Sequence, residues 1–416
     1  MAEIIIPGAQ TLKTLEKTLK ENYLNPWRNG LSTEPSPLLG KVTKKKLESN
    51  EIVASAPQGL SGGFGYGAEG MATPAAGNVM YERFKTYAKD MYVNIAISAK
   101  AVRLTGSGGA MTNALHSEVK AAYETAKWNL GRSLFGNGDG ILAKTKAVSG
   151  STTIELVTEP TVVDGESGTT LSTTNPHRLI KEGLIIDIYA SGANYNSEPQ
   201  AKGVRVISVD RVNNTITISG NPVSLDAGFV TIQNSYGKEI TGIGAIFDDN
   251  IDTLYGVKKS ENKIIVPTVV DANTDIDDGV IWDAVEGAET YKNSKIDTIL
   301  MGKSAYKHYI DYLRTNNVRV EAMTKEITGG FKAIDYAFGN RTIDVVYEQF
   351  IPDDEAWCID STSLELHIQE WDFANLQGGG IFNLMENSSI YRALLANYGN
   401  LICNNPGGLV RITNCA

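Results

Sequence analysis

The sequence has few cysteines and no long hydrophobic run. The chain has 416 residues, and its three cysteines, Cys358, Cys403 and Cys415, cannot form a complete set of disulfides. This is typical of proteins made in a reducing compartment. No stretch approaches the roughly 18 to 20 apolar residues of a membrane-spanning helix. The N-terminus, MAEIIIPGAQ, has neither the basic start nor the apolar core of a signal peptide. We therefore expect a globular protein with no membrane contact.

The sequence also lacks a convincing active site or metal site. Its four histidines are far apart and have no metal-ligand companion one helical turn away, and neither C-x-x-C nor H-E-x-x-H occurs. Cys358 lies in the apolar segment AWCID, which favours a core residue over a nucleophile. The acidic segment DIDDG (275–279) favours the first turn of a helix over a calcium site, because a helix N-terminus attracts negative charge. We therefore predict that the protein is not an enzyme and has no catalytic residue, metal or cofactor.

Two motifs imitate nucleotide-binding loops without their context. Residues 65–70, GYGAEG, match G-x-G-x-x-G, but a strand and a helix do not flank them. In MGKSAY, the position of the first P-loop glycine is occupied by Asp297. We interpret Ser304 as the cap of the helix that follows.

The segment GNGDG, residues 136–140, partly matches the start of a calcium-binding loop. Asn137 and Asp139 begin such a pattern, but Ile141 and Val148 occupy later ligand positions. We interpret the segment as a helix stop with left-handed glycines at Gly136 and Gly138, followed by a sharp turn.

The charge of the chain is unevenly distributed. Residues 1–135 contain 16 Lys and Arg against 11 Asp and Glu, a balance of +5, so the remainder must carry −15 to give the net −10. The acidic remainder disfavours a dedicated nucleic-acid binder. The basic third is expected to meet acidic surface in the same chain or in a neighbour, although two unrelated solvated faces would give the same asymmetry.

The first eighty residues are expected to have almost no core of their own. Residues 9–23 predict an amphipathic helix with Leu12, Leu15, Leu19 and Tyr23 on one stripe, which Asn25-Pro26 and Asn29-Gly30 should end. Residues 55–79 hold seven glycines and cannot offset their own ordering entropy. We therefore expect residues 1–79 to be stabilised by neighbouring subunits.

The next segments predict one strand, one long helix and a β-rich module. Residues 92–104 alternate at period two and predict a strand, and residues 112–135 predict a helix in which Gly131 indicates close packing or a bend. Strands are expected at 152–157, 184–190, 203–210, 214–220 and 228–233, with a hairpin tip at Asn213-Asn214. The module, residues 141–240, could be a carbohydrate-binding sandwich, but it has no visible aromatic platform, and a structural insertion is favoured.

From residue 262 helices and strands alternate. We expect strands at 262–267, 295–301, 341–348, 356–360 and 364–370, and helices at 278–293 and 304–314. The expected class is α+β.

The order of these segments resembles that of a tailed-bacteriophage major capsid protein. ISAKAVRLTGSGGAMTNALHSEVKAAYETAKWNLGRSLFGNGDGILA is similar to the family's strand leaving the extended loop, its spine helix and the glycine turn. RTIDVVYEQFIPDDEAWCID and SIYRALLANYGNLICNNPGGLVRIT resemble its late strands and closing strands. The resemblance covers most of residues 50–416.

The resemblance implies the capsid fold with an insertion domain. Its parts would be an N-terminal arm (1–54), an extended loop with its strands (55–98), a peripheral domain with the spine helix (99–140), the inserted β domain (141–240), an axial domain with peripheral segments (241–400) and a closing strand (401–416).

The implied function is self-assembly into hexamers and pentamers of an icosahedral head around double-stranded DNA. Assembly would take place in the host cytoplasm, with a separate scaffolding protein and a portal as partners. The subunit interface would include Lys44, Lys45, Lys46, Phe64, Tyr66, Tyr81, Arg83, Lys85 and Lys89. The alternatives are an encapsulin-like nanocompartment shell and a carbohydrate-binding surface protein.

Overall fold

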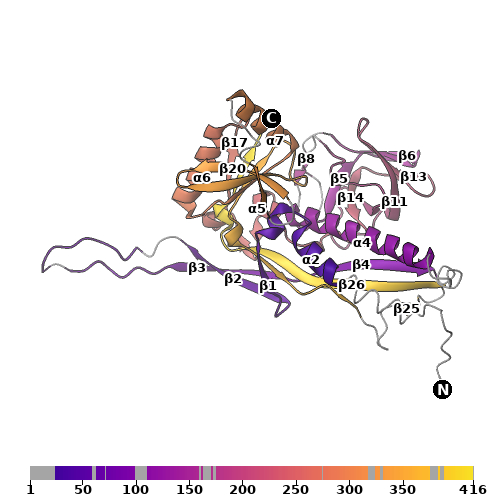
Figure 1. Ribbon diagram of the computed structural model, residues 1–416, viewed down its shortest axis with the longest axis horizontal. Helices are drawn as coiled ribbons and strands as arrows, with labels where there is room; N and C mark the ends of the chain where they lie inside the picture. Colours follow the sequence, from indigo (N-terminus) through magenta and orange to yellow (C-terminus); the bar gives the residue numbers. More distant parts are fainter. Residues whose placement is uncertain are drawn as a thin grey trace, which may run out of the picture.

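The computed structural model describes most of the chain, and its fold class is α+β, as predicted. The described residues are 24–58, 62–70, 72–98, 110–158, 161–162, 170–171, 175–273, 275–316, 324–327, 331–374, 383–384 and 388–415. The predicted helix at 9–23 lies outside them, as do residues 99–104 of the predicted strand. Figure 1 shows three bodies of structure around one long helix, and a thin hairpin that leaves them on one side.

The long helix and a long antiparallel ribbon form the centre of the fold. Helix α4 (Ala110–Phe135) lies along strands β4 (Lys89–Ser98) and β26 (Ile390–Cys403), which pair from Lys89 opposite Gly399 to Ser98 opposite Ile390 (Figure 1). Val119 and Leu134 of the predicted stripe are buried, as is Ile95 on the ribbon. The same sheet includes β1 (Thr43–Lys46), β23 (Leu364–Ile368), β24 (Asp372–Phe373) and β25 (Asn383–Leu384).

The segment before β1 folds against this centre. Helix α2 (Asn25–Thr33) and the 3-10 helix η2 (Pro37–Gly40) place Trp27, Leu31 and Leu39 in the core. Helix α2 begins at Asn25-Pro26, because proline is tolerated in a first turn; the helix that this pair was expected to end lies outside the described residues. Two other expectations are wrong. Asn29-Gly30 lies inside α2 and does not end a helix. Residues 24–54 also do not lack a core, because they share that of their own chain.

A seven-stranded mixed sheet forms the second body. Its order is β17-β27-β22-β18-β21-β20-β19. Helices α6 (Asp278–Lys292) and α7 (Lys303–Thr315) accompany it, and each buries an apolar stripe that includes Ile281 and Tyr309 respectively. The strands are β17 (Thr268–Asp271), β18 (Thr298–Met301), β19 (Thr324–Ile327), β20 (Phe331–Phe338), β21 (Arg341–Tyr347), β22 (Ala356–Ile359) and β27 (Val410–Thr413).

Two local predictions in this body are wrong. The segment 262–267 contains the 3-10 helix η3 (Lys263–Ile265), because the Asn262 side chain accepts a hydrogen bond from the Ile264 amide and caps it. The N-cap of α7 is Gly302, without a side-chain bond, so Ser304 is not the cap. By contrast, the acidic segment does begin α6, since Asp277 accepts the Val280 amide at 2.8 Å.

The third body consists of strands from residues 141–232. A six-stranded sheet has the order β5-β14-β10-β11-β12-β7, and β6 pairs with β13. Asp210 opposite Thr215 closes the predicted hairpin, with Asn214 at a φ of 51°. The strands are β5 (Ile141–Thr145), β6 (Val148–Ser151), β7 (Thr153–Glu155), β10 (Ile185–Ala190), β11 (Ala201–Asp210), β12 (Thr215–Ile218), β13 (Val223–Leu225) and β14 (Gly228–Ile232).

The remaining elements are short. They are β8 (Thr161–Val162), β9 (Thr170–Leu171), α5 (Gly244–Phe247), β15 (Thr253–Leu254), β16 (Val257–Lys258), η5 (Ser361–Ser363) and η6 (Pro406–Gly408).

Candidate subunit interface

The hairpin that projects from the body is the main candidate interface. Strand β2 (Glu51–Gln58) pairs with β3 (Met80–Tyr87) through eight antiparallel positions, from Glu51 opposite Tyr87 to Gln58 opposite Met80. No third strand joins them in the described residues, and Figure 1 shows the ribbon extending far from the sheets. A lone two-stranded ribbon is marginally stable in water. This segment therefore gains most from contact with another surface.

The base of the hairpin is anchored within the chain. Phe84 is fully buried, and its ring lies 5.9 Å from that of Tyr255. The Lys85 amide donates to the Tyr255 carbonyl oxygen at 2.8 Å. Asn400 on β26 donates to the Thr86 hydroxyl at 2.8 Å. These contacts fix the direction in which the ribbon leaves the body.

Beyond its base the hairpin presents aromatic side chains to solvent. Phe64, Tyr66 and Tyr81 are 83%, 94% and 66% exposed. The rings of Phe64 and Tyr66 meet edge to face at 5.3 Å. A Cβ at Gly63 would lie 3.0 Å from the Gly77 nitrogen, so the two arms run close together at this point. Exposed aromatic groups on a projecting segment are typical of protein contact surfaces.

The predicted basic interface residues on β3 and β4 have different surroundings. Arg83 is exposed, and Lys85 forms an ion pair with Glu51 across the ribbon at 2.6 Å. Lys89 donates to the Gly237 carbonyl oxygen at 3.2 Å, and burial lowers the pKa of its ammonium group. Only Arg83 of these three has no ion pair or hydrogen bond among the described residues.

Lys44, Lys45 and Lys46 lie elsewhere, on the edge strand β1. This strand runs parallel to β23, and all three lysines are exposed. Lys45 pairs with Glu365 at 2.8 Å, and Lys44 donates to the Ser32 carbonyl oxygen at 2.6 Å. Lysines on an edge strand also oppose pairing with foreign strands. The basic run therefore has a role within the chain, whether or not it contacts a neighbour.

The GNGDG turn connects the two ends of the β-rich module. Helix α4 ends at Phe135, and the left-handed glycines are Gly138 (φ 98°) and Gly140 (φ 78°); Gly136 is not left-handed. The Gly237 amide donates to the Asp139 carbonyl oxygen at 2.8 Å. The chain therefore enters and leaves the module at one place.

The end of α4 is packed too tightly for larger residues. The Ile243 amide donates to the Leu134 carbonyl oxygen at 2.8 Å. A Cβ at Gly242 would lie 2.4 Å from that oxygen, and a Cβ at Gly244 would lie 2.4 Å from the Phe135 oxygen. The returning segment therefore covers carbonyl groups that the helix end leaves unpaired.

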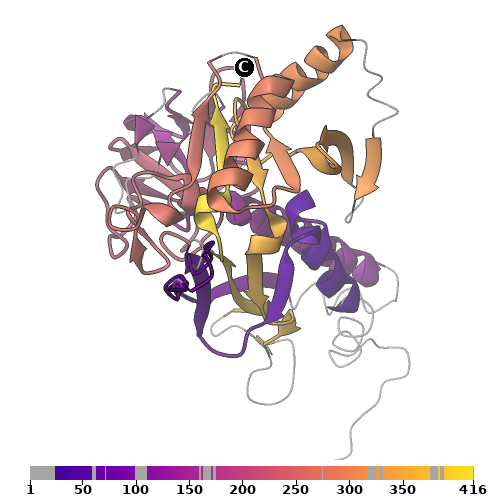
Figure 2. The same cartoon turned by 90° about the vertical axis from the view of Figure 1, so that its left-hand side faces the viewer.

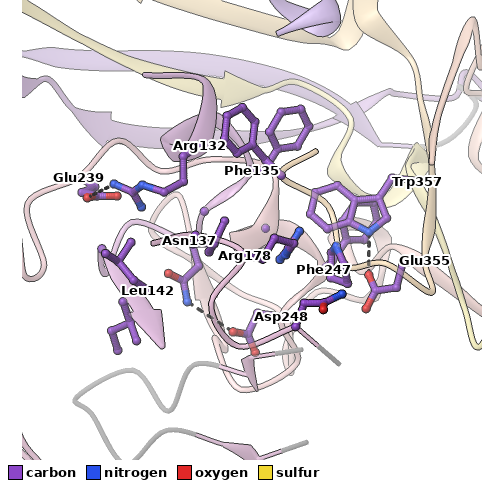
Figure 3. A pocket seen from close by; sticks show the side chains of 18 of the residues that line it. Arg132, Phe135, Asn137, Leu142, Arg178, Glu239, Phe247, Asp248, Glu355 and Trp357 are labelled. Atoms are coloured by element: carbon purple, nitrogen blue, oxygen red, sulfur yellow. Dashed lines mark hydrogen bonds and ion pairs between the residues drawn. The ribbon is translucent and has the colours of Figure 1, made fainter. Parts of the chain in front are cut away.

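Sequence reasoning missed a small polar pocket beside this turn. Figure 3 shows its lining side chains, with Arg132 directed toward Glu239, Asn137 directed toward Asp248, and Arg178 between them and Trp357. Two buried ion pairs border it: Arg132 with Glu239 at 2.5 Å, and Arg411 with Glu355 at 2.5 Å. The partners are more than fifty residues apart in the chain, so no local pattern could have revealed them. Three arginines and three carboxylates line the pocket, so its formal charges balance.

A second polar arrangement involves residues 34–41, which we call the strap. Glu34 accepts hydrogen bonds from Tyr123 and Lys127 of α4, both at 3.0 Å, and the Lys127 bond lowers the pKa of Glu34. Ser36 bonds to Glu348 at 2.7 Å. At the other end, Lys41 pairs with Asp344 at 2.6 Å. The strap is thus attached to both the long helix and the seven-stranded sheet.

The described residues contain no group of three His, Cys, Asp or Glu side chains that could hold a metal. Within that same part of the chain, no helix has the length and apolar character to cross a membrane.

Sequence comparisons assign no family. No family model matches the chain, and no curated protein matches it in sequence.

Structure comparisons find similar folds among shell proteins. The capsid of cyanophage A-1(L) is similar over 92% of this chain and 93% of its own, with 10% identity and a TM-score of 0.49. An encapsulin from Synechococcus elongatus is similar over 90% and 85%, with 8% identity and a TM-score of 0.45. A structure of Mycobacterium phage Bobi is similar over 97% and 98%, with 8% identity and a TM-score of 0.42. The cyanophage capsid and the encapsulin are shell proteins, and the chain shares their fold.

Proposed function

We propose that this chain is the structural subunit of a protein shell of the tailed-phage capsid type. The observation that carries the proposal is the β2–β3 hairpin, which is anchored at its base, exposes Phe64 and Tyr66, and extends away from the sheets (Figure 1). Figure 2 shows the molecule turned by 90°, so that the hairpin side faces the viewer. A projecting two-stranded ribbon adds little stability to a monomer, whereas a shell subunit can use it to overlap its neighbour. Projecting segments of this kind give the heterologous contacts from which closed shells are built.

In the finer form of the proposal, subunits assemble as hexamers and pentamers of an icosahedral head that encloses double-stranded DNA. A scaffolding protein and a portal would be separate partners, and the location would be the virion after assembly in the host cytoplasm. The interface would include the hairpin residues and the lysines of β1. The overall acidic charge suits only non-specific contact with packaged DNA, because a dedicated binder would be basic.

The aromatic cluster of the module offers no exposed platform to a carbohydrate. Tyr189, Phe229 and Tyr236 form a cluster, but each of them is at most 6% exposed. Sugar rings stack on exposed aromatic faces, and these faces are covered by one another. Tyr195, which packs on Tyr236, is 39% exposed, but a single ring is not a platform, and its hydroxyl donates to Asp139.

The test is the particle size of the full chain. We expect particles of tens of nanometres by light scattering and negative-stain electron microscopy of clarified lysate. A chain that remains monomeric at every concentration, including with its co-expressed neighbouring genes, would contradict a shell role. Nuclease-protected DNA inside the particles would support the capsid form, and particles that contain only protein would favour the encapsulin-like form.

A further inference from the structure

A buried carboxyl group holds the strap where several parts of the chain meet. Glu348 follows β21 of the seven-stranded sheet and is 2% exposed. One of its oxygens bonds to the hydroxyl of Ser36, itself 0% exposed, at 2.7 Å. The other accepts the Phe350 amide at 3.2 Å. The Phe350 ring packs edge to face on Trp128 of α4 at 6.0 Å. A change at Glu348 therefore reaches the strap, the sheet and the helix together.

This group is the most deeply buried polar attachment of the strap. Leu38 and Leu39 are buried in the short turn that follows Ser36. The Ser36 hydroxyl also accepts the Leu38 amide at 3.2 Å, which starts η2. The hydroxyl thus links the turn of the strap directly to the carboxyl group.

Most other charged side chains near Glu348 form ion pairs with residues other than Glu348. Arg178, from the module side, is the charge that acts on Glu348, and it also faces Asp353 and Glu355. Tyr347, the last residue of β21, directly precedes Glu348 and interacts with it electrostatically. The ion pairs of the surrounding elements are Glu34 with Lys127, Lys41 with Asp344, and Arg132 with Glu239.

We propose that protonation of Glu348 controls how tightly the strap is held against the rest of the chain. A neutral carboxyl group can be buried between Ser36 and the Phe350 amide at little cost, whereas a carboxylate there loses hydration that two or three hydrogen bonds only partly replace. The inference concerns the single chain and does not depend on its assembly.

The pH dependence of strap docking follows from the difference in the pKa of Glu348 between the docked and the open strap. Burial raises the pKa of Glu348 to about 7 from an ordinary 4.5, against hydrogen bonds from Ser36 and the backbone that lower it. Opening of the strap would expose Glu348 to water and return its pKa toward the ordinary 4.5. The stabilisation of the docked strap is therefore complete below pH 4.5 and is lost as pH rises through 7. Opening of the strap should increase by up to about tenfold per pH unit in this window and level off above it.

Hydrogen exchange of the strap amides measures this opening. The reporters are Leu39, Lys41 and Val42, whose amides donate to carbonyl oxygens of the strap itself. The full-length protein is compared with E348Q at each pH from 4.5 to 8, because the ratio of their rates cancels the intrinsic pH dependence of exchange. Glutamine keeps the shape of the side chain and can donate to Ser36 while accepting the Phe350 amide.

We expect the ratio of the wild-type exchange rate to the E348Q exchange rate to rise with pH and then level off near neutrality. E286Q, which alters an exposed carboxyl group on α6, should show the wild-type profile. A ratio of wild-type to E348Q exchange rates that stays constant from pH 4.5 to 8 would overturn the proposal. An equal rise in the ratio of wild-type to E286Q exchange rates would also overturn it.

S36A is the second variant, and it decides the matter if E348Q does not fold. It keeps Glu348 but removes a hydrogen bond that favours the ionised form, so the midpoint of the strap's pH profile should move to higher pH. An unchanged midpoint in S36A would overturn the proposal.

Discussion

Gly131 of α4 lies directly against the carbonyl oxygen of Pro35 in the strap. A Cβ at this position would lie 2.6 Å from that oxygen and 2.7 Å from the Phe350 ring. Glycine inside a helix costs about 1 kcal/mol relative to alanine, and here it permits the strap to pass. Of the two explanations that the sequence left open, the structure shows close packing.

The Gly131→Ala substitution should therefore destabilise the protein by about 1 to 3 kcal/mol, because overpacking outweighs the better helix propensity. Gly287 is the matched control, since it lies inside α6 and a Cβ there would meet no neighbouring segment within 4 Å. Gly287→Ala should stabilise by about 0.5 to 1 kcal/mol. Urea unfolding of both variants measures the difference. Equal effects of the same sign would show that Gly131 is not constrained by packing.

The hairpin should become protected only on assembly. Residues 62–70 and 72–79 have no regular structure and are exposed almost throughout. We expect fast hydrogen exchange there in the free subunit and slow exchange in particles. Equal protection in both forms would remove the hairpin from the interface.

The exposed aromatic pair should carry much of that contact. The double substitution Phe64→Ala with Tyr66→Ala should slow or prevent particle formation without lowering the melting temperature, because these side chains are not part of the subunit core. Tyr291→Ala is the control, since Tyr291 is 81% exposed on α6. Light scattering follows assembly, and the idea fails if both variants assemble alike.

The buried pair of Arg132 and Glu239 should be sensitive to loss of one partner. Their side chains are only 4% and 10% exposed. Glu239→Gln leaves the Arg132 charge buried without its counter-ion, which should cost about 3 to 5 kcal/mol. Glu155→Gln breaks the pair with Lys146, whose side chains are 51% and 53% exposed, and should cost about 0 to 1 kcal/mol. Similar losses of unfolding free energy for Glu239→Gln and Glu155→Gln would contradict the expected importance of the buried pair.

The β-rich module should be removable. Its ends meet at Asp139 and Gly237, so replacing residues 141–236 with a short Gly-Ser bridge should leave a soluble chain. We expect a lower melting temperature, because Trp128 loses the cation–π contact of Lys181 at 5.1 Å. A deletion product that is entirely insoluble would show that the module belongs to the common core.

Salt should slow early assembly and leave finished shells intact. Part of the charge asymmetry is already satisfied inside the chain, as in Arg28 with Glu370 at 3.2 Å and Lys45 with Glu365 at 2.8 Å. Exposed Arg83 is the clearest remaining candidate for a neighbour, so Arg83→Glu should slow assembly at low salt. Sodium chloride at ~1 M, where the Debye length is about 3 Å, should remove the difference between Arg83→Glu and wild type. An Arg83→Glu effect that is independent of salt would argue against an electrostatic role.

Elements whose signal is local could be predicted from the amino-acid sequence. The period of α4, the alternation in β4 and β12 and the acidic start of α6 were all predicted, because side-chain periodicity reports which face is buried. The stop after Phe135 was also predicted, although the left-handed positions are Gly138 and Gly140 rather than Gly136. The α+β class follows from the order of these elements.

Features that depend on distant partners could not be predicted from the sequence and emerge from the folded chain. Asn29-Gly30 continues a helix because Tyr123 packs over Gly30, where a Cβ would lie 1.8 Å from its hydroxyl oxygen. The strap packs closely on α4 because the helix has a glycine opposite Pro35. The burial of Glu348 depends on contact with Ser36, which is 312 residues away in the chain. Propensity is a weak preference that packing overrides, and the burial that shifts a carboxyl group's pKa exists only once the surrounding segments are in place.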